Sequence, residues 1–171
     1  MKGKSQHGED AVLFDLIGDQ VGGIVFDVGA RLKGSNVAKL IEERDFTGVL
    51  VEANKASAEI LKKEFGDKVI VFNVQATFDN INQLAPPEID VCSIDVDSID
   101  WWLWARLEVN PRFVVIESNT KMKTGYAPYD PDVNWHSKPY GASGDALKKL
   151  GEIKGYELVT QKGVNLIFRR I

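Results

Sequence analysis

Short apolar runs alternate with amphipathic stretches along most of this 171-residue chain, and this alternation restricts the fold more than any other feature. Runs rich in Val, Ile and Phe and bounded by turn residues predict buried strands at residues 23–28, 48–52, 69–72, 89–94 and 112–116. Apolar residues at helical spacing predict helices over residues 36–44 and 54–65, over the tryptophan-rich stretch after the fourth strand, and from Ser143 onward. Strands that alternate with helices form a parallel sheet with helices on both faces.

The last part of the chain departs from that alternation. Two strand-like runs, residues 156–159 and 164–168, flank Lys162 and Gly163, a pair typical of a hairpin turn. Two strands joined by a tight turn must run antiparallel to each other. The predicted fold class is therefore α/β, with a doubly wound, mostly parallel sheet that ends in an antiparallel hairpin. A plain dinucleotide-binding fold would not end in this way.

Length and composition favour one domain. A domain of about 150 residues is the default size, so residues 1–171 are expected to form a single domain that opens with a helical segment over residues 1–22. Hydrophobic residues make up 44% and charged residues 27%, which excludes a disordered chain. The net charge of −4 argues against a general nucleic-acid binder, and no apolar run approaches the roughly 18 residues of a membrane span. Because the start is unlike a signal peptide and Cys92 is the only cysteine, we expect a cytoplasmic protein.

Two acidic residues stand where nucleoside-binding α/β folds hold their ligands. Asp27 ends the first predicted strand just before Gly29 and Ala30, and a glycine there lets the backbone turn tightly and approach a ligand. Glu52 ends the second strand about twenty residues later, where a carboxylate can accept hydrogen bonds from ribose hydroxyls. The alternative is that Asp27 only caps the next helix and Glu52 is a solvated strand end. In this strand context the pair favours a nucleoside site.

Further acidic residues follow the next two strands. Asp95, Asp97 and Asp100 come after the fourth strand, and Glu117 and Asn119 come after the fifth. Because neighbouring parallel strands end side by side, these oxygens are expected to converge. Such ligands would suit Mg²⁺, so magnesium stays an alternative. We predict no metal site, because hydrogen bonds to helix amides and to the loop backbone explain the same residues.

Residues 118–141 are the longest stretch without a regular pattern, and they hold three prolines and three tyrosines. Long loops of this kind are usually functional or disordered, and the aromatic content argues against disorder. Since the stretch follows the fifth strand, it is predicted to fold over the carboxyl edge of the sheet and to wall a pocket, with Tyr126 among the apolar contacts. His136, facing that pocket, could accept a proton, although a surface histidine is the alternative.

An ordered set of short motifs spans nearly the whole chain. The motifs are S-Q-H-G-E-D at 5–10, F-D-V-G-A at 26–30, S-N at 35–36, G-V-L-V-E at 48–52, N-I-N at 80–82, S-I-D-V-D at 93–97, V-I-E-S-N at 115–119, Y-D-P at 129–131 and Y-G-A-S at 140–143. Together they resemble the FkbM-like methyltransferases, and most closely the short relatives of bacteria and phages. The resemblance implies the Rossmann-like fold of class I S-adenosylmethionine-dependent methyltransferases, in which the last strand runs against the others.

The resemblance also implies an activity and a set of site residues. The expected reaction is methyl transfer from S-adenosylmethionine to oxygen on a small polar acceptor such as a sugar. Such an enzyme must align acceptor and methyl group and assist the loss of the acceptor proton. The expected cofactor residues are Asp27, Gly29, Ala30, Glu52, Gln75, Ala76 and Asp95, with Gln75 and Ala76 beside adenine. The expected catalytic residues are Asp97 and His136.

The loop after Ala30 departs from the family pattern. Arg31-Leu32-Lys33-Gly34 is shorter than the usual glycine-containing loop, and it mimics a dinucleotide-binding motif whose middle glycine has become Arg31. That glycine normally lets the backbone reach a pyrophosphate, so an NAD-dependent oxidoreductase is disfavoured. The Arg31 side chain is predicted either to point out of the cofactor cleft or to fill it. A non-catalytic binding module with a degenerate cofactor loop is therefore the main alternative to the enzyme.

Overall fold

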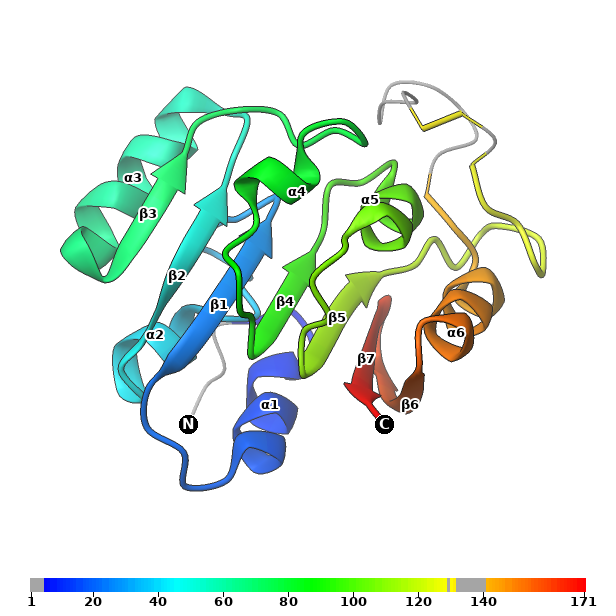
Figure 1. Ribbon diagram of the computed structural model, residues 1–171, viewed down its shortest axis with the longest axis horizontal. Helices are drawn as coiled ribbons and strands as arrows, with labels where there is room; N and C mark the ends of the chain where they lie inside the picture. Colours follow the sequence, from blue (N-terminus) through cyan, green and yellow to red (C-terminus); the bar gives the residue numbers. More distant parts are fainter. Residues whose placement is uncertain (1–4, 129, 132–140) are drawn as a thin grey trace.

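The computed structural model of the chain describes residues 5–128, 130–131 and 141–171. Within them, seven strands form one sheet in the order β3-β2-β1-β4-β5-β7-β6 (Figure 1). The strands are β1 (Gly23–Val28), β2 (Phe46–Val51), β3 (Val69–Phe72), β4 (Val91–Ile94), β5 (Phe113–Glu117), β6 (Tyr156–Lys162) and β7 (Asn165–Arg170). Strands β1 to β5 are parallel, whereas β7 runs antiparallel to both β5 and β6. The predicted fold class, including the closing hairpin, is confirmed.

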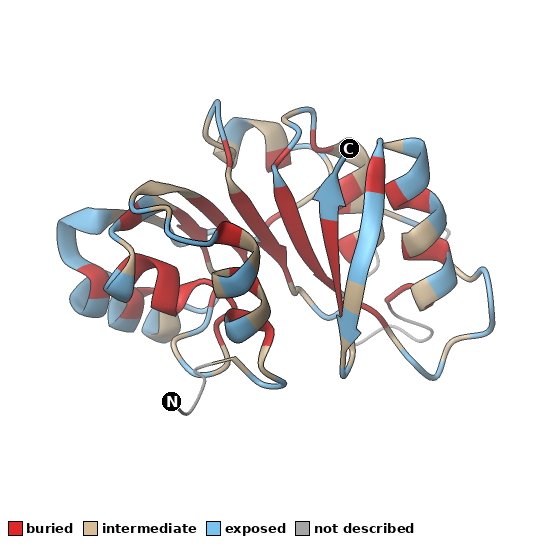
Figure 2. Ribbon diagram, turned by 90° about the horizontal axis from the view of Figure 1, so that it is seen from below, coloured by how far each residue is buried: buried red, intermediate tan, exposed pale blue. Residues whose placement is uncertain are grey.

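Helices cover both faces of this sheet. They are α1 (Glu9–Ile17), α2 (Ala38–Glu43), α3 (Lys55–Phe65), α4 (Ile81–Leu84), α5 (Asp100–Arg106) and α6 (Gly144–Ile153), with a 3₁₀ turn, η1, at Gly66–Lys68. One core holds side chains of α1, α2 and α3, and the other holds side chains of α4, α5 and α6. The buried central strands lie between these layers (Figure 2). None of the described helices has the length and apolarity needed to cross a lipid bilayer.

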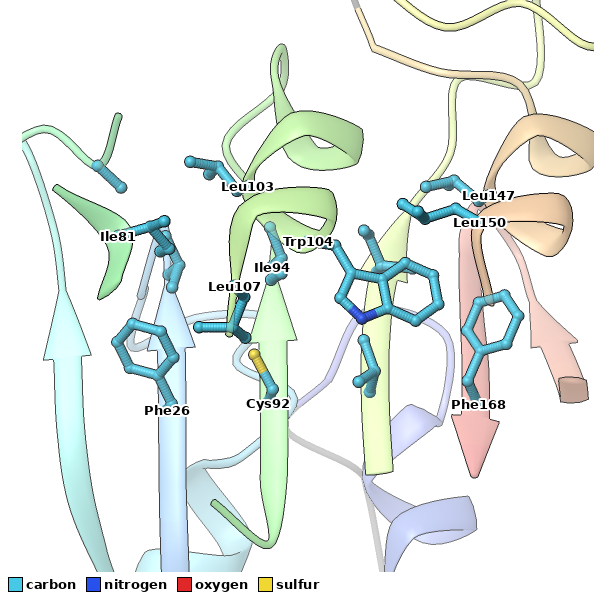
Figure 3. Close-up of a cluster of buried hydrophobic side chains, with 14 of the residues drawn as sticks. Phe26, Ile81, Cys92, Ile94, Leu103, Trp104, Leu107, Leu147, Leu150 and Phe168 are labelled. Carbon is cyan, nitrogen blue, oxygen red and sulfur yellow. The ribbon is translucent and has the colours of Figure 1, made fainter. Parts of the chain in front are cut away.

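The core under α5 and α6 is built around Trp104. Its indole is fully buried, and its ring centroid lies 4.8 Å from that of Phe168 on β7 and 5.6 Å from that of Tyr156 on β6. Figure 3 shows the indole beside Leu147 and Leu150 of α6. This packing fixes α5, and it thereby fixes the loop that joins β4 to α5.

The predicted helix starts are confirmed by their caps. The side chain of Asn54 accepts a hydrogen bond from the Ser57 amide at 3.0 Å, and that of Ser143 accepts one from the Ala146 amide at 3.2 Å. Differences from prediction lie at element ends. Strand β4 begins at Val91 rather than at residue 89, β6 continues to residue 162, and the one-turn helix α4 was not predicted.

The N-terminal segment, residues 5–10, connects two distant loops. Ser5 forms an isolated β-bridge with Gly34, so the segment lies beside the loop that follows β1. Glu9 is fully buried, and its Oε1 accepts a hydrogen bond from the Asn165 side chain at 2.6 Å, which ties the segment to the start of β7. The segment therefore fixes the hairpin relative to the loop that carries Arg31.

Candidate functional site

A cavity of about 540 Å³ lies along the carboxyl ends of β1 to β4. Its walls are formed by Gly29, Arg31, Val51, Glu52, Ala53, Ser57, Val74, Gln75, Ala76, Asp95, Val96, Asp97, Ser98 and Ile99. Residues 74–76 follow β3, and Glu52 follows β2. The other charged residues of the wall follow β1 and β4; they are Arg31, Asp95 and Asp97. The sheet order β3-β2-β1-β4 therefore arranges the wall from an uncharged end to a charged end. This edge is where open α/β sheets bind ligands.

The turn after β1 is possible only with glycine. Gly29 has a φ of +83°, and a Cβ at this position would lie 1.9 Å from the backbone oxygen of Asp95. The amides of Gly29 and Ala30 both donate hydrogen bonds to the carbonyl of Val51, at 2.9 and 3.0 Å. The tight turn predicted from the sequence is present, and it brings the ends of β1 and β4 into direct contact.

Two of the predicted cofactor residues, Asp27 and Ala30, are buried and do not line the cavity. Burial raises the pKa of Asp27 to about 7, although a hydrogen bond with Ser93 opposes the rise. Ser35 Oγ lies 3.5 Å from the Asp27 carboxyl and accepts a hydrogen bond from the Ala38 amide at the start of α2. Asp27 therefore supports the loop between β1 and α2 from beneath, through Ser35, and does not itself cap α2.

Glu52, Gln75 and Ala76 all line the cavity, as expected from their places after β2 and β3. One carboxylate oxygen of Glu52 accepts a hydrogen bond from the Asn54 amide at 2.6 Å. This contact holds the carboxyl group at the strand end, beside the first turn of α3. The side-chain amide of Gln75 and the methyl group of Ala76 form a largely uncharged wall next to it.

The charged end of the cavity is organised by Arg31. Its guanidinium lies 2.9 Å from Asp95 Oδ1 and 3.9 Å from Asp97 Oδ2, and the side chain is 44% exposed. Burial would lower the pKa of Arg31, but the carboxylates of Asp95 and Asp97 raise it above its usual value. Arg31 therefore lines the charged end of the cavity, where its guanidinium is paired with Asp95.

A second cavity of about 250 Å³ adjoins the first. It is lined by Asp97, Asp100, Glu117, Ser118, Asn119, Thr120, Lys121, Gly141 and Val164. Asp97 lines both cavities, and Ser118 is fixed by hydrogen bonds from its amide and its Oγ to the Val164 carbonyl. The two ends of the 118–141 stretch thus wall a pocket, but Tyr126 lines neither cavity. His136 lies outside the described residues, so its predicted position stays a prediction.

The expected convergence of acidic side chains is found between the two cavities. Oxygens of Asp95, Asp97 and Glu117 lie within 4.8 Å of one another. Burial and the nearby Asp95 carboxylate raise the pKa of Glu117 to about 9, and burial raises the pKa of Asp95 as well. The two carboxyl groups of Asp95 and Glu117 lie close enough for the protonation of one to depend on that of the other.

Asp100 does not join this cluster. Its two carboxylate oxygens accept hydrogen bonds from the amides of Val96 and Ser98, at 2.8 and 3.0 Å. Both amides belong to the loop between β4 and α5, so Asp100 makes the hydrogen bonds to the loop backbone that were expected as the alternative to a metal. Burial nevertheless raises the pKa of Asp100 to about 7. Its role is to hold the loop after β4 in shape.

The carboxylate cluster does not support magnesium. Mg²⁺ is bound in nearly octahedral geometry through one or two carboxylates and several waters. In this cluster the guanidinium of Arg31 already contacts Asp95 and lies near Asp97. The positive charge that a metal would bring is thus supplied by the chain itself.

Comparisons with known proteins place this geometry within one fold. The cyclopropane synthase MmaA2 from Mycobacterium tuberculosis matches with a TM-score of 0.59 at 13% identity, over 95% of this chain and 69% of its own. Two S-adenosylmethionine-dependent methyltransferases solved with S-adenosylhomocysteine also match. The one from Geobacter sulfurreducens has a TM-score of 0.56 at 16% identity, and the one from Thiobacillus denitrificans 0.55 at 14%. Each match covers 94% of this chain and 68% of the other.

The chain has the Rossmann-like fold of class I S-adenosylmethionine-dependent methyltransferases. No protein-family model and no curated protein sequence matches it. At these low identities the methyltransferase structures establish the fold alone. The activity must therefore be argued from the residues of the two cavities.

Several wall residues were not expected from the sequence. Val74 and Ser98 line the first cavity, and Thr120 and Val164 line the second. Three of them lie a few residues beyond the carboxyl end of a parallel strand, so strand order alone could have indicated them. Val164 could not be found in that way, because its place depends on how the hairpin packs against β5.

Proposed function

We propose that the chain is an S-adenosylmethionine-dependent methyltransferase of the FkbM-like type. The observation that carries the proposal is the larger cavity, which joins an uncharged end after β3, the Glu52 carboxylate after β2 and a charged end after β1 and β4. S-adenosylmethionine has the same order of chemical groups: a flat base, a ribose with two hydroxyls, and a charged amino acid. The methyltransferase structures of the same fold support the proposal.

In this proposal each part of the wall has one task. Gln75 and Ala76 flank adenine, and Glu52 accepts hydrogen bonds from the ribose hydroxyls. Gly29 allows the backbone to approach the ligand, and Asp95 receives the ammonium group of its amino-acid end. Asp27 and Ala30 act from beneath the cavity by shaping the turn that carries Gly29.

The acceptor is proposed to bind in the smaller cavity and to be methylated on oxygen. The walls there are polar, with hydroxyl, amide and carboxyl groups that suit a small polyhydroxylated molecule such as a sugar. Transfer forms a bond from the acceptor oxygen to the methyl carbon, breaks the carbon–sulfur bond and releases the hydroxyl proton. Asp97 borders both cavities and is proposed to take that proton, with His136 as a second proposed catalytic residue.

One observation favours a different function, a binding module that has lost cofactor chemistry. Arg31 lines the larger cavity, and its guanidinium is paired with Asp95, the residue proposed to hold the ammonium group. If this arrangement is permanent, the cavity cannot accept the amino-acid end of the cofactor. The protein would then act through the aromatic-rich stretch 118–141.

Calorimetric titration with S-adenosylhomocysteine tests the proposed function through Glu52. Glu52→Ala and Glu52→Gln should each weaken binding by about tenfold or more, because a hydrogen bond to a charged group contributes on the order of 1.5–3 kcal/mol. The exposed Glu64→Ala on α3 is the control and should bind like the wild type. Thermal melting of each variant checks that the fold persists. Equal affinity in all four proteins would remove Glu52 from the site.

A further inference from the structure

Arg31 is the charged residue of the larger cavity to which the proposed function gives no task. We infer that Arg31 is the receptor for the carboxylate of a zwitterionic ligand, and that Asp95 holds its guanidinium until the ligand's ammonium group takes its place. The inference rests on the proposed function, since it assigns the amino-acid end of the cofactor to the charged end of the cavity. It differs from the binding-module interpretation, in which the same side chain blocks the ligand.

The geometry of Arg31 fits an exchangeable contact. The guanidinium contacts one oxygen of Asp95 at 2.9 Å and lies 3.9 Å from Asp97. Its side chain is 44% exposed, whereas that of Asp95 is 16% exposed. Arg31 therefore lies toward solvent and Asp95 lies deeper, fixed by its hydrogen bond with Glu117. The arginine is thus the more exposed partner of the pair, and the carboxylate is the more buried one.

Charge balance explains why a zwitterion is selected. Removing Arg31 from Asp95 without replacement would leave a largely buried carboxylate unpaired, which is costly. A ligand that brings both an ammonium and a carboxylate replaces one ion pair by two, because the ammonium pairs with Asp95 and the carboxylate pairs with the freed guanidinium. Arginine suits the second contact, since its planar donors match a carboxylate in a bidentate arrangement.

The fixed backbone around Arg31 also favours this role. Arg31 follows Ala30 directly after the turn at Gly29, so its backbone is fixed by the two hydrogen bonds to Val51. Only the side chain has to rotate to move from Asp95 to a neighbouring carboxylate. The loop that carries it is further held by Ser5 and Gln6 against Gly34. Ligand exchange therefore needs no change in the fold.

Three ligands that differ only at the amino-acid end test the inference by calorimetry. S-adenosylhomocysteine carries both charges, its decarboxylated analogue carries only the ammonium, and 5′-methylthioadenosine carries neither. Each is titrated into the wild type, Arg31→Gln and the control Arg169→Gln, which removes an ion pair with Glu157 at the far edge of the sheet. Thermal melting confirms that each variant is folded.

We expect Arg31→Gln to weaken binding of S-adenosylhomocysteine by about tenfold or more and to leave 5′-methylthioadenosine within about threefold. The decarboxylated analogue should bind Arg31→Gln at least as tightly as the wild type, because its ammonium no longer competes with the guanidinium for Asp95. Arg169→Gln should change none of the three affinities. Tighter binding of all three ligands by Arg31→Gln would overturn the inference and identify Arg31 as a block. Unchanged affinity for S-adenosylhomocysteine would overturn it as well. If no ligand binds any of the proteins, the proposed function itself has failed, which is a separate and recognisable result.

Discussion

Asp27 shows how single buried residues determine the behaviour of this site. The residue is 4% exposed, and burial raises the pKa of its carboxyl group from 3.8 to about 7. A carboxyl whose pKa is higher in the folded state than in the unfolded state contributes stability at low pH. This contribution is complete below the unfolded pKa, and it is lost as the pH rises through the folded pKa.

The window for Asp27 therefore runs from about pH 4 to about pH 7. Across it the free energy of unfolding of the wild type should fall on the order of a few kcal/mol. In Asp27→Asn the fall should be smaller, because the titrating group is gone. Urea denaturation at pH 5 and pH 8 measures the difference, with the exposed Asp79→Asn as control. An identical loss in wild type and Asp27→Asn would refute the assignment.

At the scale of elements, the N-terminal segment and the β6–β7 hairpin support the site together. Gly163 in the hairpin turn has a φ of +57°, and a Cβ added there would lie 2.5 Å from the imidazole of His7. The His7 amide in turn donates a hydrogen bond to Glu9 at 2.8 Å, which holds the backbone of His7 beside the turn. The ring of His7 therefore lies against the turn, on the exposed side of the segment.

Gly163→Ala should be destabilised for two separable reasons. The positive φ alone costs roughly 1 kcal/mol, and the contact with His7 adds to this. Gly155→Ala has a similar φ of +82° with nothing within 4 Å of the new Cβ, so it measures the conformational cost alone. The double variant His7→Ala/Gly163→Ala should regain only the part of the unfolding free energy that the contact with His7 removes. Chemical denaturation measures this free energy. A double variant no more stable than Gly163→Ala would show that the segment does not pack on the turn.

The same elements show what the sequence can and cannot predict. Strands β1 and β3 were predicted at their observed bounds, because apolar runs flanked by turn residues specify buried strands almost locally. Helix α4 was missed, because it is a single turn with only Ile81 buried, too short to show a period. The burial of Glu9 and its bond to Asn165, far along the chain, could not be read from a local pattern.

For the candidate site, strand ends were the useful signal. Glu52, Gln75 and Asp95 were expected at the cavity from their positions after strands, and all three line it. The direction of the Arg31 side chain was left open, because it depends on the charge of Asp95 across the turn. Asp27 was placed in the correct strand, but its burial depends on how α2 packs against β1.

At the scale of the whole molecule, the two cavities are neighbours that share one lining residue. The larger lies at the ends of β1 to β4, the smaller lies beside β5 and the hairpin, and Asp97 borders both. This arrangement allows one cavity to hold a methyl donor and the other an acceptor, with the transferred group between them. The proposed methyl transfer therefore depends first on which ligand the larger cavity binds.

Titration of the wild-type protein with S-adenosylhomocysteine and with NAD, under identical conditions, tests that point most directly. The account predicts saturable binding of S-adenosylhomocysteine well below millimolar concentration. It predicts NAD binding at least about tenfold weaker, because Arg31 stands where a dinucleotide site needs glycine for the pyrophosphate. Tighter binding of NAD, or no heat from S-adenosylhomocysteine at millimolar concentration, would contradict the account.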